Sequence, residues 1–263
     1  MLGAILGDII GSPYEFRSPK RKDFTLFTSA CTVTDDSLMT IAVGAACVSA
    51  SLYDEQDFKS KVIYYMREIG RMNPYVGYGE KFYKWLMDDN LGPYESYGNG
   101  SGMRVSPVAW AASSLEHAEQ LAKWSAEVTH NSSEGVKGAQ AIAAAVYLAK
   151  QGRSKEEIKK YIQDNYYALN FTIEEIRPSY SFDVTCQGSV PQAIVCFLDG
   201  SDFEDTVRNA ISLGGDGDTI GAMAGSIAEA YFGIPLELQE KAFEYMDEDI
   251  LDYFYMYADE LYK

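Results

Sequence analysis

The stretch that most constrains the fold spans residues 214–219 and reads Gly-Gly-Asp-Gly-Asp-Thr. An apolar pattern with helical spacing follows at once, over residues 220–231. The glycines permit tight backbone turns, so that Asp216 and Asp218 can point at one place. Converging carboxylates repel each other, and a hard divalent cation relieves that repulsion. The alternative is a helix start capped by aspartate, and this stretch alone does not decide between the two.

A second acidic corner lies far away in the sequence, where Thr34-Asp35-Asp36-Ser37 precedes another helical apolar pattern. Adjacent aspartates at a helix start can simply complement the helix dipole, at about 0.3–1 kcal/mol each. Together, however, the two corners supply oxygen ligands of the hardness that two magnesium or manganese ions prefer. The pair of corners therefore favours a metal site over two separate helix caps.

Composition excludes several classes of function. Of the 263 residues, 47% are hydrophobic, so a sizeable core is available and a disordered body is excluded. The 39 acidic and 22 basic residues give a net charge of −17, which disfavours nucleic-acid and membrane partners. Four cysteines without a Cys-x-x-Cys pair argue against zinc and favour a reduced, cytoplasmic setting. The chain has no apolar run of the roughly 18–20 residues that a membrane span requires.

Helical apolar spacing dominates the chain, alternating strand patterns are scarce, and no linker rich in proline, glycine and serine divides it. We therefore predict a single all-α domain over residues 1–263, a compact bundle of about a dozen helices. Asp8 interrupts the apolar stripe of the first predicted helix, so it is either a hydrogen-bonded core aspartate or a support for a nearby site. Residues 170–186 lack clear periodicity, and we expect a long loop there.

Short motifs rich in glycine, histidine or acidic residues recur along the rest of the chain, at residues 7–15, 77–79, 99–104, 129–139 and 187–193. In this order, and with the two acidic corners, they resemble the motifs of the ADP-ribosylglycohydrolases. Enzymes of that family remove ADP-ribose from proteins, and their fold is a many-helix bundle with a binuclear metal cleft. This chain departs from the family at Ser37, where threonine is commoner, and at Gly217, where serine is common. Both departures leave the carboxylates in place.

The resemblance implies roles for individual residues. Two Mg²⁺ or Mn²⁺ ions would be held by Thr34, Asp35, Asp36, Asp216, Asp218 and Thr219. The catalytic carboxylates would be Glu15, on a mobile flap over the metals, Asp35 and Asp36, and the choice of general base among them stays open. ADP-ribose would contact Gly77, Tyr78, Gly79, Asn99, Gly100, Ser101, Met103 and His130. Without the resemblance, Glu15 is an exposed loop acid, His130 is a structural histidine, and Arg104 ties loops to carboxylates.

The function that the resemblance implies is metal-dependent hydrolysis of the glycosidic bond between ADP-ribose and an acceptor, for which we expect protein arginine. The same chemistry on serine-linked, O-acetyl or guanidine-like small-molecule ADP-ribose is an open alternative. A non-catalytic binding or structural protein of the same fold is another, although all four aspartates are intact. We expect a cytoplasmic monomer whose partner is an ADP-ribosylated protein or small molecule.

Overall fold

The structure is a computed structural model that describes residues 1–262. Within these residues the secondary structure is helical, with one isolated bridge between Gly98 and Thr185, which confirms the predicted all-α class. The helices are α1 (Leu2–Gly11), η1 (Ser12–Tyr14), α2 (Asp35–Ser49), α3 (Glu55–Met72), α4 (Glu80–Met87), α5 (Gly100–Met103), α6 (Ser106–Ala111), α7 (Leu115–Glu127), α8 (Ser133–Lys150), α9 (Lys155–Asn165), α10 (Ile173–Ile176), α11 (Cys186–Asp199), α12 (Phe203–Leu213), α13 (Gly217–Phe232), α14 (Leu236–Phe243) and α15 (Glu248–Leu261).

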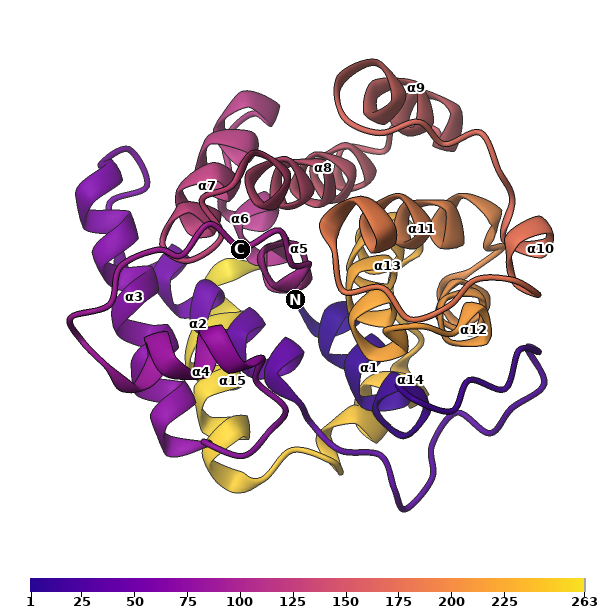
Figure 1. Cartoon of the computed structure of the whole chain (residues 1–263), viewed down its shortest axis with the longest axis horizontal. Coiled ribbons are helices and arrows are strands. Elements are labelled where there is room, and N and C mark those ends of the chain that lie inside the picture. The colour runs from indigo at the N-terminus through magenta and orange to yellow at the C-terminus, as the bar shows by residue number, and fades with distance from the viewer. Residues whose placement is uncertain (263) are drawn as a thin grey trace.

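The centre of the fold is a close crossing of α1 and α13, with α2 and α3 on one side of the pair and α11 and α12 on the other (Figure 1). A Cβ atom on Gly7 would lie 2.0 Å from the carbonyl oxygen of Gly221, and one on Gly3 would lie 2.4 Å from that of Gly225. The two backbones are therefore in direct contact, which only residues without a side chain allow. This crossing brings Asp8, in the middle of α1, next to the start of α13.

Helix α2 also runs through the interior, since its residues from Asp36 to Cys47 are all buried. A helix that is apolar on every side packs against neighbours all round, and this one contacts α1, α3, α6 and α15. Its N-cap is Thr34, whose side-chain oxygen accepts a hydrogen bond from the backbone N–H of Asp36. The starts of α2 and α13 thus meet beside α1, and each start carries two aspartates.

Two irregular segments, 15–34 and 177–185, border this meeting point, since Glu15 and Phe182 line the same cavity as Asp35 and Asp216. The Lys20 ammonium joins them, because it donates hydrogen bonds to the carbonyl oxygens of Arg177, Tyr180 and Leu213 at 3.1, 2.6 and 2.7 Å. The predicted loop over 170–186 is correct except for α10, a single helical turn that starts at a Thr172 capping box. One turn is too short to show a helical period. In the part of the chain that the structure describes, no helix is long and apolar enough to span a membrane.

Candidate metal centre and substrate cavity

The helix starts enclose a cavity of about 480 Å³. The predicted site residues that line it are Glu15, Thr34, Asp35, Asp36, Gly77, Gly79, Asn99, Gly100, Met103, His130, Asp216, Asp218 and Thr219. Segments from the whole length of the chain therefore converge on one space. A cavity of this size is in the range of small-ligand and cofactor sites.

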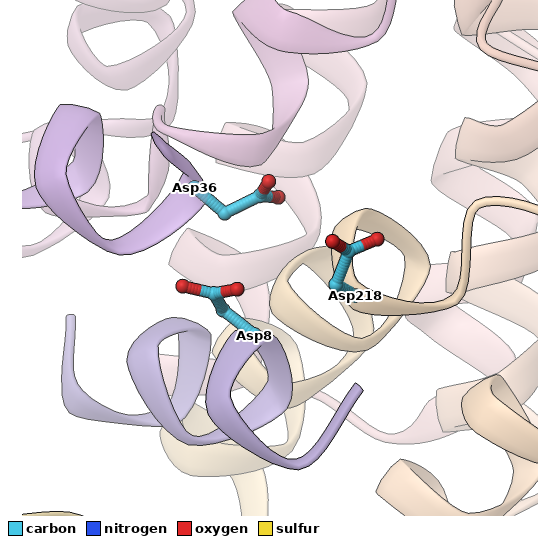
Figure 2. A group of neighbouring side chains, drawn as sticks. All are labelled: Asp8, Asp36 and Asp218. Atoms are coloured by element: carbon cyan, nitrogen blue, oxygen red, sulfur yellow. The ribbon is translucent and has the colours of Figure 1, made fainter. Parts of the chain in front are cut away.

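Three carboxylates from three helices gather beside the cavity, and two of them, Asp36 and Asp218, line it. Asp8 of α1, Asp36 of α2 and Asp218 of α13 each offer an oxygen within 4.8 Å of the others, and Figure 2 shows the three groups pointing toward one another. One oxygen of Asp36, Oδ1, is buried and has no hydrogen-bond partner among residues 1–262. Because an unpartnered buried carboxylate oxygen is costly, this atom marks a position suited to a cation.

A second cluster contains Glu15, Asp216 and Asp218, whose oxygens also lie within 4.8 Å of one another. Asp218 therefore belongs to both clusters. The side-chain amide of Asn99 donates to Asp216 Oδ2 at 2.6 Å and fixes the orientation of that carboxylate. Both clusters consist only of hard oxygen donors, so the residues present fit two adjacent divalent cations of the Mg²⁺ or Mn²⁺ type.

Asp8 satisfies both alternatives that the sequence left open. It is fully buried, and it accepts hydrogen bonds from the backbone N–H and the hydroxyl of Thr34 at 3.0 and 2.7 Å. It also accepts from the backbone N–H of Ser37 at 3.1 Å and from the Ser37 hydroxyl. Asp8 is thus a hydrogen-bonded core aspartate that lies inside the first carboxylate cluster. The sequence did not place Asp8 in this cluster, although a charge on an apolar helix face was the available signal.

Thr34 and Thr219, both predicted metal ligands, already make hydrogen bonds between the acidic groups. The Thr34 hydroxyl donates to Asp8 and accepts from the Asp36 N–H, whereas the Thr219 hydroxyl donates to Asp36 Oδ2 at 3.2 Å. Thr219 therefore joins the two acidic corners directly. A direct ligand role for either threonine stays a prediction.

Two of the predicted substrate contacts lie away from the cavity lining. The Ser101 hydroxyl is buried and donates to the carbonyl oxygen of Gly135 at 2.7 Å, which ties α5 to α8. The Tyr78 ring packs against Phe82 with centroids 5.5 Å apart. Their glycine neighbours face the cavity instead. Gly77 has a φ of 109°, and a Cβ atom there would lie 3.2 Å from Asp35 Oδ1, so this turn lies directly over Asp35.

The sequence did not single out two other lining residues, Tyr94 and Phe182, as substrate contacts. Tyr94 packs beside His130 with ring centroids 5.7 Å apart, and both residues line the cavity. Phe182 stacks on Phe16, with centroids 5.5 Å apart and ring planes at 29°. These residues carry no local motif, because they belong to separate segments that only the fold brings together.

Burial and mutual repulsion raise the pKa of the clustered carboxyl groups. The pKa of Asp36 lies well above its usual range because of burial first and the charge of Asp218 second. The pKa of Asp218 is raised in the same way, by burial and then by Asp216. Burial together with neighbouring carboxylates raises the pKa of Asp35 to about 7 and that of Glu15 to about 7. The metal-free site therefore retains protons that a divalent cation would displace.

These shifts predict the pH dependence of the metal-free protein. Because the folded pKa values of Asp35 and Glu15 are raised above the unfolded values of about 4, the folded state binds the extra protons. The stabilisation of the folded state by these two protonated groups is fully present below about pH 4, and it is lost as the pH rises through about 7. With a chelator present, the melting temperature should fall between about pH 5 and pH 8, and saturating Mg²⁺ should oppose that fall. A melting temperature in chelator that rises across this window would contradict the arrangement.

Comparison with known proteins identifies the family that this chain resembles over its whole length. A family model described as ADP-ribosylglycohydrolase matches residues 1–263. ADP-ribosylhydrolase ARH3 of Bos taurus is 29% identical, over 95% of this chain and 89% of its own length. The Mus musculus protein of the same name is 30% identical, over 95% and 88%. ADP-ribosylarginine hydrolase Tri1 of Pseudomonas putida (strain GB-1) is 26% identical, over 92% and 72%. A solved structure titled ADP-ribosylglycohydrolase-related protein complex has the same fold, with a TM-score of 0.67 and 22% identity over 97% of this chain and 96% of its own.

Proposed function

The chain belongs to the ADP-ribosylglycohydrolase family and is a hydrolase, and from that premise we propose that it releases ADP-ribose from arginine side chains with the help of two divalent cations. The observation that carries the proposal is the pair of carboxylate clusters that share Asp218, a residue that lines the cavity. Glycoside hydrolysis passes through an oxocarbenium-like state, which nearby negative charge stabilises.

The cations would be held by the residues of the two clusters. Asp8, Asp36 and Asp218 would hold one ion, and Glu15, Asp216 and Asp218 the other, with Thr219 and the remaining predicted ligands, Thr34 and Asp35, beside them. When bound, such ions orient ribose hydroxyls and lower the pKa of a water molecule. In this arrangement Glu15 would be a ligand contributed by the segment over the site as well as part of a flap.

Asp35 is the strongest candidate for the general base. It lines the cavity, yet it belongs to neither carboxylate cluster, so its side chain is left to accept a proton from water. Its backbone N–H donates to the carbonyl oxygen of Val76 at 3.2 Å, which fixes the start of α2 against the glycine turn. The ribose of the substrate would then lie between this turn and the carboxylates. Negative charge from Asp35 would stabilise the oxocarbenium-like state from the same side.

Two observations favour arginine as the acceptor. Phe182 lines the cavity, and its stacked partner Phe16 follows Glu15 directly in sequence, so an exposed aromatic pair stands beside a carboxylate. Guanidinium groups stack on aromatic rings and pair with carboxylates, which a neutral serine linkage does not do. The Pseudomonas putida relative is named an ADP-ribosylarginine hydrolase, in agreement with this choice.

The test compares release of ADP-ribose from arginine-linked and serine-linked peptides of otherwise identical sequence. We expect faster release from arginine. We also expect Phe182→Leu to lower kcat/KM for the arginine linkage about tenfold, since cation–π contacts contribute about 0.5–2 kcal/mol, and to change the serine linkage little. Tyr255→Leu, at another exposed aromatic residue, is the matched control. Faster turnover of the serine peptide would reverse the acceptor assignment, and turnover of neither would reject both linkages.

A further inference from the structure

Arg104 is a buried cation without a counter-charge. Its side chain is fully buried, and no carboxylate among residues 1–262 forms an ion pair with it, contrary to the sequence interpretation that it ties loops to carboxylates. The Nη2 atom donates to the carbonyl oxygen of Ser125 at 3.1 Å and to the Thr129 hydroxyl at 2.7 Å, while Nε has no partner. Because burying an unpaired charge is costly, its hydrogen bonds require an explanation beyond packing.

The hydrogen bond that Arg104 donates to Thr129 determines the direction of the hydrogen bond between Thr129 and His130. A guanidinium group only donates, so Thr129 Oγ1 must accept from Arg104. The same oxygen lies 2.8 Å from His130 Nδ1. In the described part of the chain the Thr129 hydroxyl hydrogen has no other acceptor, and buried donors are almost always paired. The hydroxyl therefore donates to Nδ1, and Nδ1 carries no hydrogen.

The remaining ring nitrogen of His130 then carries the proton. Burial, and after it the nearby charge of Arg104, lowers the pKa of His130 well below its usual range, so the ring is neutral. Its Nε2 atom faces the glycine turn that borders the cavity, because a Cβ atom on Gly100 would lie 3.1 Å from it and one on Gly98 3.6 Å. No residue from 1 to 262 accepts a hydrogen bond from Nε2. A buried imidazole thus offers an unpartnered N–H beside the cavity.

We propose that Arg104 is a positioning residue which, through Thr129, holds His130 as the neutral Nε2–H tautomer and so presents one fixed hydrogen-bond donor to the ligand. The proposal rests on the proposed function only where it identifies that ligand as ADP-ribose. A fixed tautomer lets the site recognise an acceptor atom without paying to reorganise the ring. The glycines at 98 and 100 leave the space through which the donor is reached.

The first arm of the test reads the tautomer directly. The chain has 2 histidines, so ring ¹⁵N spectra of histidine-labelled protein contain few signals, which His117→Gln assigns. His117 is an internal reference, since its Nδ1 accepts from the Ser113 N–H at 3.2 Å and its Nε2 lies 2.9 Å from the Leu52 carbonyl oxygen. In wild type we expect an unprotonated Nδ1 and a protonated Nε2 on His130. A protonated Nδ1, or a charged ring at about pH 7, would overturn the proposal.

Replacement of Thr129 tests the relay, that is, the pair of hydrogen bonds that links Arg104 through Thr129 to His130. Thr129→Val keeps the side-chain shape and removes the hydroxyl, so His130 should lose its single tautomer while the signals of His117 stay unchanged. Thr129→Ser keeps the hydroxyl and should restore the wild-type ring spectrum. An unchanged His130 spectrum in folded Thr129→Val would show that the relay does not hold the tautomer. If the valine variant does not fold, the wild-type spectrum and the serine variant still decide the assignment.

The second arm measures the affinity for free ADP-ribose by calorimetry in the presence of Mg²⁺. We expect Thr129→Val to bind about tenfold more weakly than wild type, as for one lost hydrogen bond, and Thr129→Ser to bind within about twofold. Equal affinity of the valine variant and wild type would overturn the positioning role. If wild type itself does not bind ADP-ribose, the identification of the ligand fails, whereas the tautomer assignment stands or falls on the spectra alone.

Discussion

Asp218→Asn should lower the rate of ADP-ribose release by about a hundredfold or more, because a metal centre contributes several kcal/mol to transition-state stabilisation. Asp218 is the residue that both carboxylate clusters share, so its loss weakens both proposed cation positions at once. Asparagine keeps the shape and can still accept the hydrogen bond that the Thr219 N–H donates to Asp218 Oδ1 at 2.9 Å. The variant should therefore fold, but bind the cations weakly and release ADP-ribose slowly.

Thermal melts separate this role from that of a helix cap. In chelator the variant should be as stable as wild type or more so, because one of several gathered carboxyl groups, which repel one another when they ionise, is gone. Mg²⁺ at about a hundred times its Kd should stabilise wild type by about 2.7 kcal/mol and the variant much less. Asp202→Asn, at the capped start of α12, is the matched control and should respond to Mg²⁺ as wild type does. A variant that melts much lower in chelator yet responds fully to Mg²⁺ would make Asp218 a structural cap.

Gly7→Ala should destabilise the protein by about 3 kcal/mol or more, beyond the usual 1–3 kcal/mol for an overpacked core, because backbone atoms cannot rotate away. The new Cβ atom would lie 2.0 Å from the carbonyl oxygen of Gly221 and 2.2 Å from its carbonyl carbon. Helices α1 and α13 must then separate. Since Asp8 follows Gly7 directly and Asp218 lies in the first turn of α13, cation affinity should fall together with stability.

Denaturant unfolding of Gly7→Ala in chelator measures the loss of stability, and Mg²⁺ titration of the folded protein measures the loss of cation affinity. Gly92→Ala is the matched control, because a Cβ atom at Gly92 would meet nothing within 4 Å. It should change the free energy of unfolding by less than about 0.5 kcal/mol, as exposed substitutions do. A Gly7→Ala protein as stable as wild type would show that the two helices do not cross in contact.

The sequence predicts the parts of this structure that have a local signal. Helical spacing predicts the all-α class. The capping box at the start of α9 is local as well, since it joins Ser154 and Glu157, three residues apart. The two acidic corners are visible because each stands at a helix start, where capping residues are expected. Their meeting in one cavity follows from the resemblance to a family, since no pattern within either corner specifies the other.

The remaining features depend on contacts between distant segments. The exposed Phe16–Phe182 pair and the Arg104–Thr129–His130 relay each join residues that show no motif together. The place of Asp8 in the first carboxylate cluster depends on the approach of α1 to α13 at Gly7, which depends on four glycines from two ends of the chain. Such packing is a long-range property, and the spacing of residues within one helix does not report it.

The most direct test of the central claim is the rate of ADP-ribose release from an arginine-linked peptide before chelation, after exhaustive chelation and after addition of Mg²⁺ or Mn²⁺. Because the carboxylates of the two clusters offer only hard oxygen atoms, release should cease in chelator and recover when either ion is restored. Undiminished release by the thoroughly chelated protein would contradict a two-cation mechanism.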